Sequence, residues 1–328
     1  MIRIAIDAMG SDQGSAMVVE AVRTFHAKYP NAQLYVVGEA KEIAPLEGLA
    51  TLVPSTEVMG MEDGALDVMR RKQTSMLKAI DLVASGQCDG VVSAGSTGAF
   101  LTGATLKLKL IPGVQRAALM SPFPTMDGKG VIILDIGANN ENRPEHLVQF
   151  AKMGAVFATK IRRIEQPAIY LLSNGAEAKK GSPVGKEAHA LLLEAEPTLF
   201  RGNMEARDVL SGHADVVVCE GYPGNVLLKG MEGTAQMMNH LLKQAFQQSI
   251  FTKIGYLFAK KGLAGMKEQL DYRKYGGAML LGVNGVVVKG HGSSNPYAFF
   301  NAMRLTYEMI DAGVVPAMKE AMSHESTN

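Results

Sequence analysis

The sequence contains no tryptophan and only two cysteines, Cys88 and Cys219, among its 328 residues. Two cysteines cannot form the disulfide framework of a small secreted protein, so we expect a reducing, cytoplasmic environment. An excess of charge is also lacking, because 33 basic side chains stand against 32 acidic ones. Such a chain has no overall electrostatic attraction to nucleic acid, and we expect no nucleic-acid partner.

Long hydrophobic runs are absent as well. The longest stretch without a charged residue, Gly90–Leu106, is interrupted by glycines and hydroxyls and is shorter than the ~20 apolar residues of a membrane-spanning helix. The chain starts with a strand-like segment, Ile2–Ile6, and lacks the basic start and apolar run of a signal peptide. Both observations favour a cytoplasmic protein.

Several motifs of common enzymes are missing too. No G-x-x-x-x-G-K-[ST] loop is present, which argues against a P-loop nucleotide enzyme, and no G-x-G-x-x-G follows the first expected strand, which weakens a dinucleotide-binding interpretation. There is no G-x-S-x-G nucleophile elbow. The seven histidines form no His-Glu-x-x-His pattern and no metal-ligand pairing with cysteine. We therefore expect neither a metal site nor a cofactor.

Five short apolar runs each lead directly into a turn rich in glycine and hydrogen-bonding side chains. The runs end at Ile6, Val92, Leu134, Val218 and Val288. In open α/β sheets, ligands bind at the carboxyl ends of the strands. Glycine lets backbone amides approach a ligand closely, and a following helix N-terminus favours negative charge. We therefore expect the turns to converge on an anion, and we favour phosphate.

The alternation of short β-branched runs with longer amphipathic ones predicts βαβ units and a mostly parallel sheet. We expect residues 1–328 to form a single α/β domain. The expected strands are Ile2–Ile6, Leu34–Val37, Gly90–Ser93, Ala117–Ser121, Val131–Asp135, Ala168–Leu172, Val216–Cys219 and Val286–Val288. The expected helices are Gly14–Tyr29, Ser75–Ser85, Pro144–Arg163, Pro183–Ala195 and Asn225–Gln248.

One segment, residues 243–274, interrupts this alternation with a basic, amphipathic helical pattern. It carries seven basic and two acidic residues. It could be a helix docked on the core with its lysines in solvent. It could instead contact a membrane surface or an acidic partner protein. One helical face is apolar through Phe246, Ile250, Ile254, Leu257 and Phe258.

The remaining chemistry is an anion site without an evident covalent nucleophile. Cys219 ends an expected strand beside Glu220 and could be a nucleophile, although lone cysteines in such strands are more often buried packing residues. Phosphate itself can attack a thioester, because the leaving thiol has a pKa of about 8.5 and departs as thiolate with little acid catalysis. The protein then has to orient phosphate and stabilise the tetrahedral oxyanion.

An ordered set of motifs resembles one known family, the bacterial acyl carrier protein:phosphate acyltransferases of phospholipid synthesis. The resemblance extends from Ile4 to about Ala317. The matching motifs are Ile6-Asp7-Ala8-Met9-Gly10, Ser93-Ala94-Gly95, Leu134-Asp135-Ile136-Gly137-Ala138-Asn139, Gly224-Asn225-Val226, Tyr275-Gly276-Gly277, Leu280-Leu281-Gly282-Val283-Asn284-Gly285 and Gly290-His291-Gly292-Ser293-Ser294-Asn295.

The resemblance implies an enzyme that moves a long acyl group from acyl carrier protein to inorganic phosphate. The acyl phosphate would then be used by a membrane glycerol-3-phosphate acyltransferase. The implied fold is a three-layer α/β/α arrangement similar to phosphotransacetylases and to isocitrate- and isopropylmalate-dehydrogenase-like enzymes, with a helical excursion around residues 225–281. The implied state is a homodimer that associates peripherally with membrane.

The same resemblance implies that Lys180 and Asn225 are catalytic. The family's Lys-Gly-Asn turn reads Lys180-Gly181-Ser182 here, so serine replaces the asparagine. Serine also replaces the usual glycine at Ser11 and the usual asparagine at Ser96. We expect the remaining turn residues to bind substrate and phosphate, namely Asp7, Gly10, Ser93, Gly95, Ser96, Thr97, Asp135, Gly137, Asn139, Gly224, His291 and Ser293.

Each assignment has a plainer alternative. Lys180 could be a solvated loop lysine, and Asn225 could only cap the helix after Gly224. Asp7 and Asp135 could be turn formers that bond their own backbone, and we expect Asp135 to order its loop.

Broader alternatives also remain at this stage. His291 could contact a ligand or satisfy its own turn. The whole chain could be a phosphotransacetylase or a dehydrogenase on a similar fold. It could also be a non-catalytic scaffold for lipid enzymes at the membrane.

Overall fold

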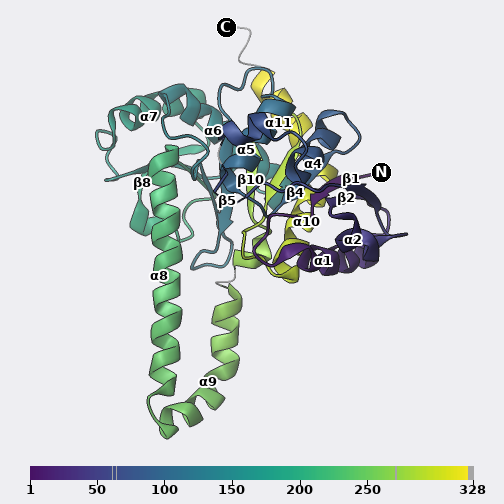
Figure 1. The fold of residues 1–328 in the computed structure, drawn as a ribbon. Coiled ribbons are helices and arrows are strands. Elements are labelled where there is room, and N and C mark those ends of the chain that lie inside the picture. Colours follow the sequence, from purple (N-terminus) through teal and green to yellow (C-terminus); the bar gives the residue numbers. More distant parts are fainter. Residues whose placement is uncertain (61, 64, 270–271, 324–328) are drawn as a thin grey trace.

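A computed structural model describes residues 1–60, 62–63, 65–269 and 272–323 of the chain. Within these residues the protein is built on one 11-stranded sheet (Figure 1). The strand order is β3-β2-β1-β4-β11-β10-β5-β6-β9-β7-β8. The strands are β1 (Arg3–Asp7), β2 (Gln33–Gly38), β3 (Thr51–Pro54), β4 (Gly90–Ser93), β5 (Ala118–Phe123), β6 (Val131–Leu134), β7 (Ile169–Ser173), β8 (Phe200–Glu205), β9 (Val216–Val218), β10 (Ala278–Leu281) and β11 (Val286–Lys289).

Helices cover both faces of the sheet, so the architecture has three layers, α/β/α. One face is covered by α1 (Gly14–Lys28), α2 (Ala40–Ile43), α6 (Pro144–Arg162), α7 (Pro183–Ala195), α10 (Pro296–Asp311) and α11 (Val314–Ser323). The other face is covered by α3 (Ala65–Arg70), α4 (Ser75–Ala84), α5 (Thr97–Leu108) and the first turns of α8 (Gly221–Gln247). A further helix, α9 (Ile250–Gln269), forms a hairpin with α8 that projects from the body (Figure 1).

Side-chain alternation along the strands explains why two apolar cores form. In β1, Ile4 and Ile6 are fully buried in one core, whereas Ala5 between them is buried in the other. In β4, Val91 and Val92 divide between the cores in the same way. Successive strand residues point to opposite faces, so a continuous apolar run is what a doubly covered sheet requires.

The direction of the strands changes three times across the middle of the sheet. Strands β3, β2, β1, β4 and β11 are mutually parallel, and so are β6, β9, β7 and β8. Between them, β10 is antiparallel to both β11 and β5, and β5 is antiparallel to β6. The two parallel groups therefore run in opposite directions, and their carboxyl ends lie at opposite edges of the sheet.

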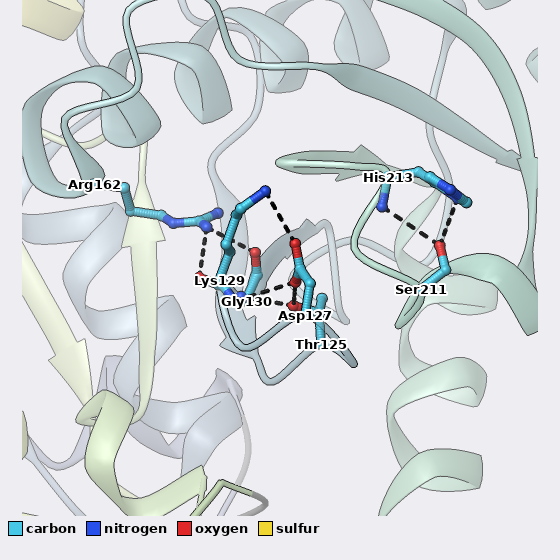
Figure 2. A network of polar contacts seen from close by, with 7 residues as sticks. All are labelled: Thr125, Asp127, Lys129, Gly130, Arg162, Ser211 and His213. Atoms are coloured by element: carbon cyan, nitrogen blue, oxygen red, sulfur yellow. Dashed lines mark hydrogen bonds and ion pairs between the residues drawn. The ribbon is translucent and has the colours of Figure 1, made fainter.

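The turn between β5 and β6, where the chain reverses, is held by a local polar network (Figure 2). The Thr125 hydroxyl donates to Asp127 Oδ1 at 2.5 Å, and the Lys129 ammonium pairs with Asp127 Oδ2 at 3.2 Å. From α6, the Arg162 guanidinium donates to the carbonyl oxygens of Lys129 and Gly130 at 2.8 and 2.7 Å. The guanidinium thus satisfies backbone acceptors at the start of β6 and fixes the reversal.

The predicted α/β/α fold with a mostly parallel sheet is confirmed. Each predicted strand and helix has a counterpart within a few residues of its expected bounds. The expected elements did not include β3, β8, β10, α2, α3, α5, α10 or α11.

Over residues 243–269 this pattern forms a hairpin and not one continuous helix, because α8 ends at Gln247 and α9 starts at Ile250. Residues 270 and 271 of the predicted segment lie outside the described residues. A helix docked on the core was one interpretation of this segment. It does not fit, because Leu257 is 69% and Phe258 86% exposed.

Candidate functional site

The glycine-rich turns gather in two groups and not at one point. The turns after β1, β4 and β11 lie at one edge of the sheet, and those after β6, β9 and β7 lie at the opposite edge. With ~3.3 Å per strand residue and ~4.8 Å between strands, the ends of β11 and β6 are about 20 Å apart. The expectation that all five turns converge is therefore wrong for a single chain. We call these groups the β1/β4/β11 edge and the β6/β9/β7 edge.

Asp135 organises the β6/β9/β7 edge. Its Oδ1 accepts backbone hydrogen bonds from Leu119, Gly137 and Ala138 at 2.9–3.1 Å. Its Oδ2 accepts from the backbone N–H of Asn139 at 2.9 Å and from the Asn139 side chain at 2.7 Å. Burial raises the pKa of this carboxyl, although the hydrogen bonds oppose that rise. Both oxygens are occupied in ordering the loop, so Asp135 has the geometry of a turn former.

Two glycines let this loop pack closely against the start of α8. Gly137 has a φ of +127°, and a Cβ there would lie 2.5 Å from Asn225 Nδ2. A Cβ at Gly224 would overlap the carbonyl oxygen of Asp135. Any side chain at either position would move the loop and helix apart, so these glycines fix the position of Asn225.

Asn225 lies inside α8 and does not cap it. The helix starts at Gly221, with Glu220 as the N-cap residue, so the capping alternative is wrong. The exposed Asn225 side chain donates from Nδ2 to the carbonyl oxygen of Ile136 at 3.1 Å. This hydrogen bond holds the Asn225 amide against the loop that Asp135 orders.

Lys180 lies on the neighbouring turn, between β7 and α7, and is exposed. Its backbone N–H donates to the carbonyl of Glu177 at 2.9 Å. Ser182, two residues on, caps α7 by accepting from Gly185 at 2.9 Å, and its hydroxyl donates to Glu220 Oε1 at 2.6 Å. This hydrogen bond ties the Lys180 turn to the start of α8. Lys180 and Asn225 therefore lie on two connected elements of the same edge, the turn between β7 and α7 and the start of α8.

Cys219, the cysteine at this edge, packs in the apolar core. Cys219 is 1% exposed, and its thiol donates to the carbonyl of Asp135 at 3.2 Å. Burial, followed by the nearby acids Asp135 and Glu220, raises the pKa of the Cys219 thiol well above its usual range. A thiol with a raised pKa supplies little thiolate for attack.

The β1/β4/β11 edge contains a buried polar cluster. The Ser93 hydroxyl donates to Asp7 Oδ2 at 2.7 Å and accepts from the Gly95 N–H at 3.1 Å. Asp7 Oδ1 accepts from the backbone of Met9 at 3.1 Å. Burial raises the pKa of Asp7 to about 6, against the lowering effect of the Ser93 hydrogen bond. Gly10, with a φ of +81°, passes close to Gly95, so the first and second turns of this edge touch through glycine.

The other predicted residues of this edge are turn and cap residues. Ser96 is the N-cap of α5, and its hydroxyl donates to the carbonyl of Asp63 at 3.2 Å. Thr97 is the first, exposed residue of that helix. His291 and Ser293 are both exposed, and the imidazole Nδ1 lies 2.8 Å from the Ser293 hydroxyl.

One buried charged residue of this edge was not among the predicted site residues. Lys289 is the last residue of β11 and is only 6% exposed. Burial lowers its pKa to about 8, while Asp7 and Asp12 oppose that shift. The sequence feature that could have indicated a buried charge is a lysine directly after the three valines of an expected buried strand. The expected strand ended at Val288, one residue too early to include it.

The described residues hold no group of three or more His, Cys, Asp or Glu side chains placed to bind a metal ion. Over the same residues, no helix combines the length and hydropathy that crossing a membrane requires. What the two edges offer is hydrogen-bond donors, lysines and helix N-termini. These groups stabilise anions and developing negative charge on oxygen.

The fold places the chain in the class of three-layer α/β/α proteins with a mostly parallel sheet. A branched-chain phosphotransacylase from Enterococcus faecalis superposes with a TM-score of 0.59 at 18% identity, covering 94% of this chain and 100% of the other. A phosphotransacetylase from Streptococcus pyogenes gives 0.58 at 18% identity, covering 98% and 94%. These likenesses establish the fold.

Sequence comparison narrows the class to one family. The family model described as "Fatty acid synthesis protein" matches residues 2–317. A phosphate acyltransferase from an Exiguobacterium species is 42% identical over 98% of this chain and 99% of its own length, and one from Lysinibacillus sphaericus is 41% identical over 98% and 99%. The chain belongs to the phosphate acyltransferase family and is an acyltransferase. The predicted family is confirmed, and the dehydrogenase and scaffold alternatives lose their support.

Proposed function

We propose that the protein transfers a long acyl group from acyl carrier protein to inorganic phosphate, yielding acyl phosphate for phospholipid synthesis. The observation that carries the proposal is the placement of Lys180 on a turn that the Ser182–Glu220 hydrogen bond joins to the start of α8, where Asn225 lies. Family membership supports acyl transfer to phosphate. The acyl phosphate would then pass to a membrane glycerol-3-phosphate acyltransferase.

In the proposed reaction a phosphate oxygen attacks the thioester carbonyl carbon. The carbon–oxygen bond forms, the carbonyl π electrons move onto oxygen, and the oxyanion then collapses with loss of the carrier thiolate. Lys180 and Asn225 donate hydrogen bonds to the phosphate and the oxyanion. The thiolate needs little acid catalysis, because its conjugate thiol has a pKa of about 8.5. No acyl-enzyme is formed.

We further propose that two copies of the chain share each reaction site. The resemblance assigns residues of both edges to one reaction, yet the two edges are about 20 Å apart within a chain. A second copy could bring its Lys180 and Asn225 to the β1/β4/β11 edge of the first. Two large apolar residues beside Asn225 support this dimer, since Tyr222 is 69% and Val226 54% exposed in the single chain.

The direct test of the activity is to mix the enzyme with palmitoyl-acyl carrier protein and phosphate and to detect acyl phosphate by mass. Lys180→Ala and Asn225→Ala should each lower turnover by about 10²–10³-fold while remaining folded, which is the usual cost of removing a preorganised oxyanion donor. Near-normal turnover by either folded variant would contradict the catalytic assignment.

Mixed dimers test the shared site. Lys180→Ala and Ser93→Ala chains should both be impaired as pure proteins. Refolding or co-expressing them together should restore part of the activity, because one of the two sites in a mixed dimer then receives intact residues from both chains. Activity that stays at the level of the pure variants would show that each chain carries a complete site.

We propose that the tip of the α8–α9 hairpin makes the peripheral contact with membrane. Three apolar side chains of α9 are strongly exposed, Phe251 at 81%, Leu257 at 69% and Phe258 at 86%. Lys260 and Lys261 follow them on the same helix and are exposed. A basic amphipathic helix of this kind binds anionic lipid surfaces. The same positive charge could attract the acidic acyl carrier protein.

A further inference from the structure

Lys289 is a buried cation without a counter-ion in the described chain. Its side chain is 6% exposed, and its ammonium donates a short hydrogen bond to the carbonyl of Gly290. Among the described residues it makes no ion pair within 4.0 Å and no other hydrogen bond. Removing a charge from water is costly unless the charge is paired and hydrogen-bonded. Two ammonium N–H groups therefore lack the partner that such burial requires.

The acid beside Lys289 already has its own hydrogen-bond donors. Asp7 acts on the ammonium electrostatically, but its carboxylate is already held by Ser93 and by the backbone of Met9. The hydroxyl of Ser75, at the start of α4, is fully buried beside this carboxylate and lowers its pKa. A buried ammonium with unused donors, next to an acid whose oxygens are already engaged, points to a missing hydrogen-bonding anion.

We propose that Lys289 binds the phosphate substrate, and that Asp7 is a positioning residue that orients the ammonium. Phosphate offers several acceptor oxygens, so it can take the remaining N–H donors of Lys289. The proposal rests on the proposed function and extends it, because it assigns the phosphate-binding cation to the β1/β4/β11 edge.

The test compares phosphate dependence in the full-length wild type and in Lys289→Met, which keeps most of the length of the side chain and removes its charge. We expect the KM for phosphate to rise at least about tenfold, as for loss of a hydrogen bond to a charged group. The KM for the acyl carrier thioester should stay within about twofold. Lys41→Met, which removes an exposed lysine of α2, is the matched control and should leave both values unchanged.

Two outcomes would overturn this proposal. An unchanged phosphate KM in a folded Lys289→Met enzyme overturns it and makes Lys289 a structural cation. A rise in the thioester KM alone also overturns it, because the lysine would then bind the acyl carrier substrate and not phosphate. If Lys289→Met does not fold, Asp7→Asn/Lys289→Met removes both charges and the same phosphate KM decides. Wild-type enzyme that forms no acyl phosphate refutes the proposed function, whereas direct phosphate binding, followed by ³¹P line broadening, still tests Lys289.

Discussion

Removing the buried charges of Asp7 and Lys289 together should make the protein more stable. Burial raises the pKa of Asp7 from 3.8 to about 6 and lowers that of Lys289 from 10.5 to about 8. One pKa unit corresponds to about 1.4 kcal/mol, so each ionised group costs about 3 kcal/mol of stability near pH 7. The two costs are not fully additive, because each already includes the attraction between the groups.

We therefore expect Asp7→Asn/Lys289→Met to raise the free energy of unfolding by about 2–4 kcal/mol, in the range seen when buried charges are replaced by neutral residues. The amide oxygen that takes the place of the Asp7 carboxylate oxygen can still accept from Ser93. The gain corresponds to several degrees in Tm for a chain of this size. Binding function should be lost in the same variant, so stability and activity would change in opposite directions.

The two pKa shifts determine whether wild-type stability rises or falls with pH. Between about pH 4 and 6 the folded state holds the Asp7 proton more tightly than the unfolded chain, so wild-type stability falls as pH rises. Between about pH 8 and 10 the unfolded chain holds the Lys289 proton more tightly, so wild-type stability rises with pH. Asp12, the other acid acting on Lys289, is exposed and present in both proteins.

Urea unfolding of both proteins across this pH range measures the difference directly. The stability advantage of the double variant should grow from pH 4 to 6, stay level from pH 6 to 8 and shrink above pH 8. Taking the difference in the free energy of unfolding between the two proteins cancels the titration of all other groups that they share. A double variant that is less stable than wild type at pH 7, or a difference that does not depend on pH, would refute the reasoning.

Three further predictions concern other parts of the chain. Cys219→Ser should retain turnover, and no acyl group should be trapped on the protein without phosphate; a trapped acyl-enzyme seen by mass would overturn the direct-attack mechanism. Gly137→Ala should lower kcat and change KM less, because the added Cβ displaces the Asn225 amide; unchanged kcat in steady-state assays would count against a catalytic Asn225. Replacing Leu257 and Phe258 by serine should abolish sedimentation with anionic vesicles and preserve turnover of acyl carrier substrate; unchanged sedimentation of the folded variant would place the membrane contact elsewhere.

The sequence by itself determined the class of fold and most strand positions. Runs such as Val91–Val92 and Ile132–Leu134 are apolar on both sides, which only a sheet covered on both faces satisfies. The glycines of the strand-end turns were equally readable, because Gly137 and Gly224 stand where a side chain would collide with Asn225 or Asp135. These are local requirements, and local sequence encodes them.

Only the tertiary structure decided which turns meet. Nothing in the local pattern of β5 or β10 shows that they pair antiparallel to their neighbours, yet those pairings send the Asp7 and Asp135 turns to opposite edges. The sequence likewise left Asn225 as a possible cap, although α8 begins at Gly221. Strand order and direction depend on contacts between residues far apart in the chain. For that reason the separation of the two edges, and the unpaired charge of Lys289 between Asp7 and Gly290, became visible only in three dimensions.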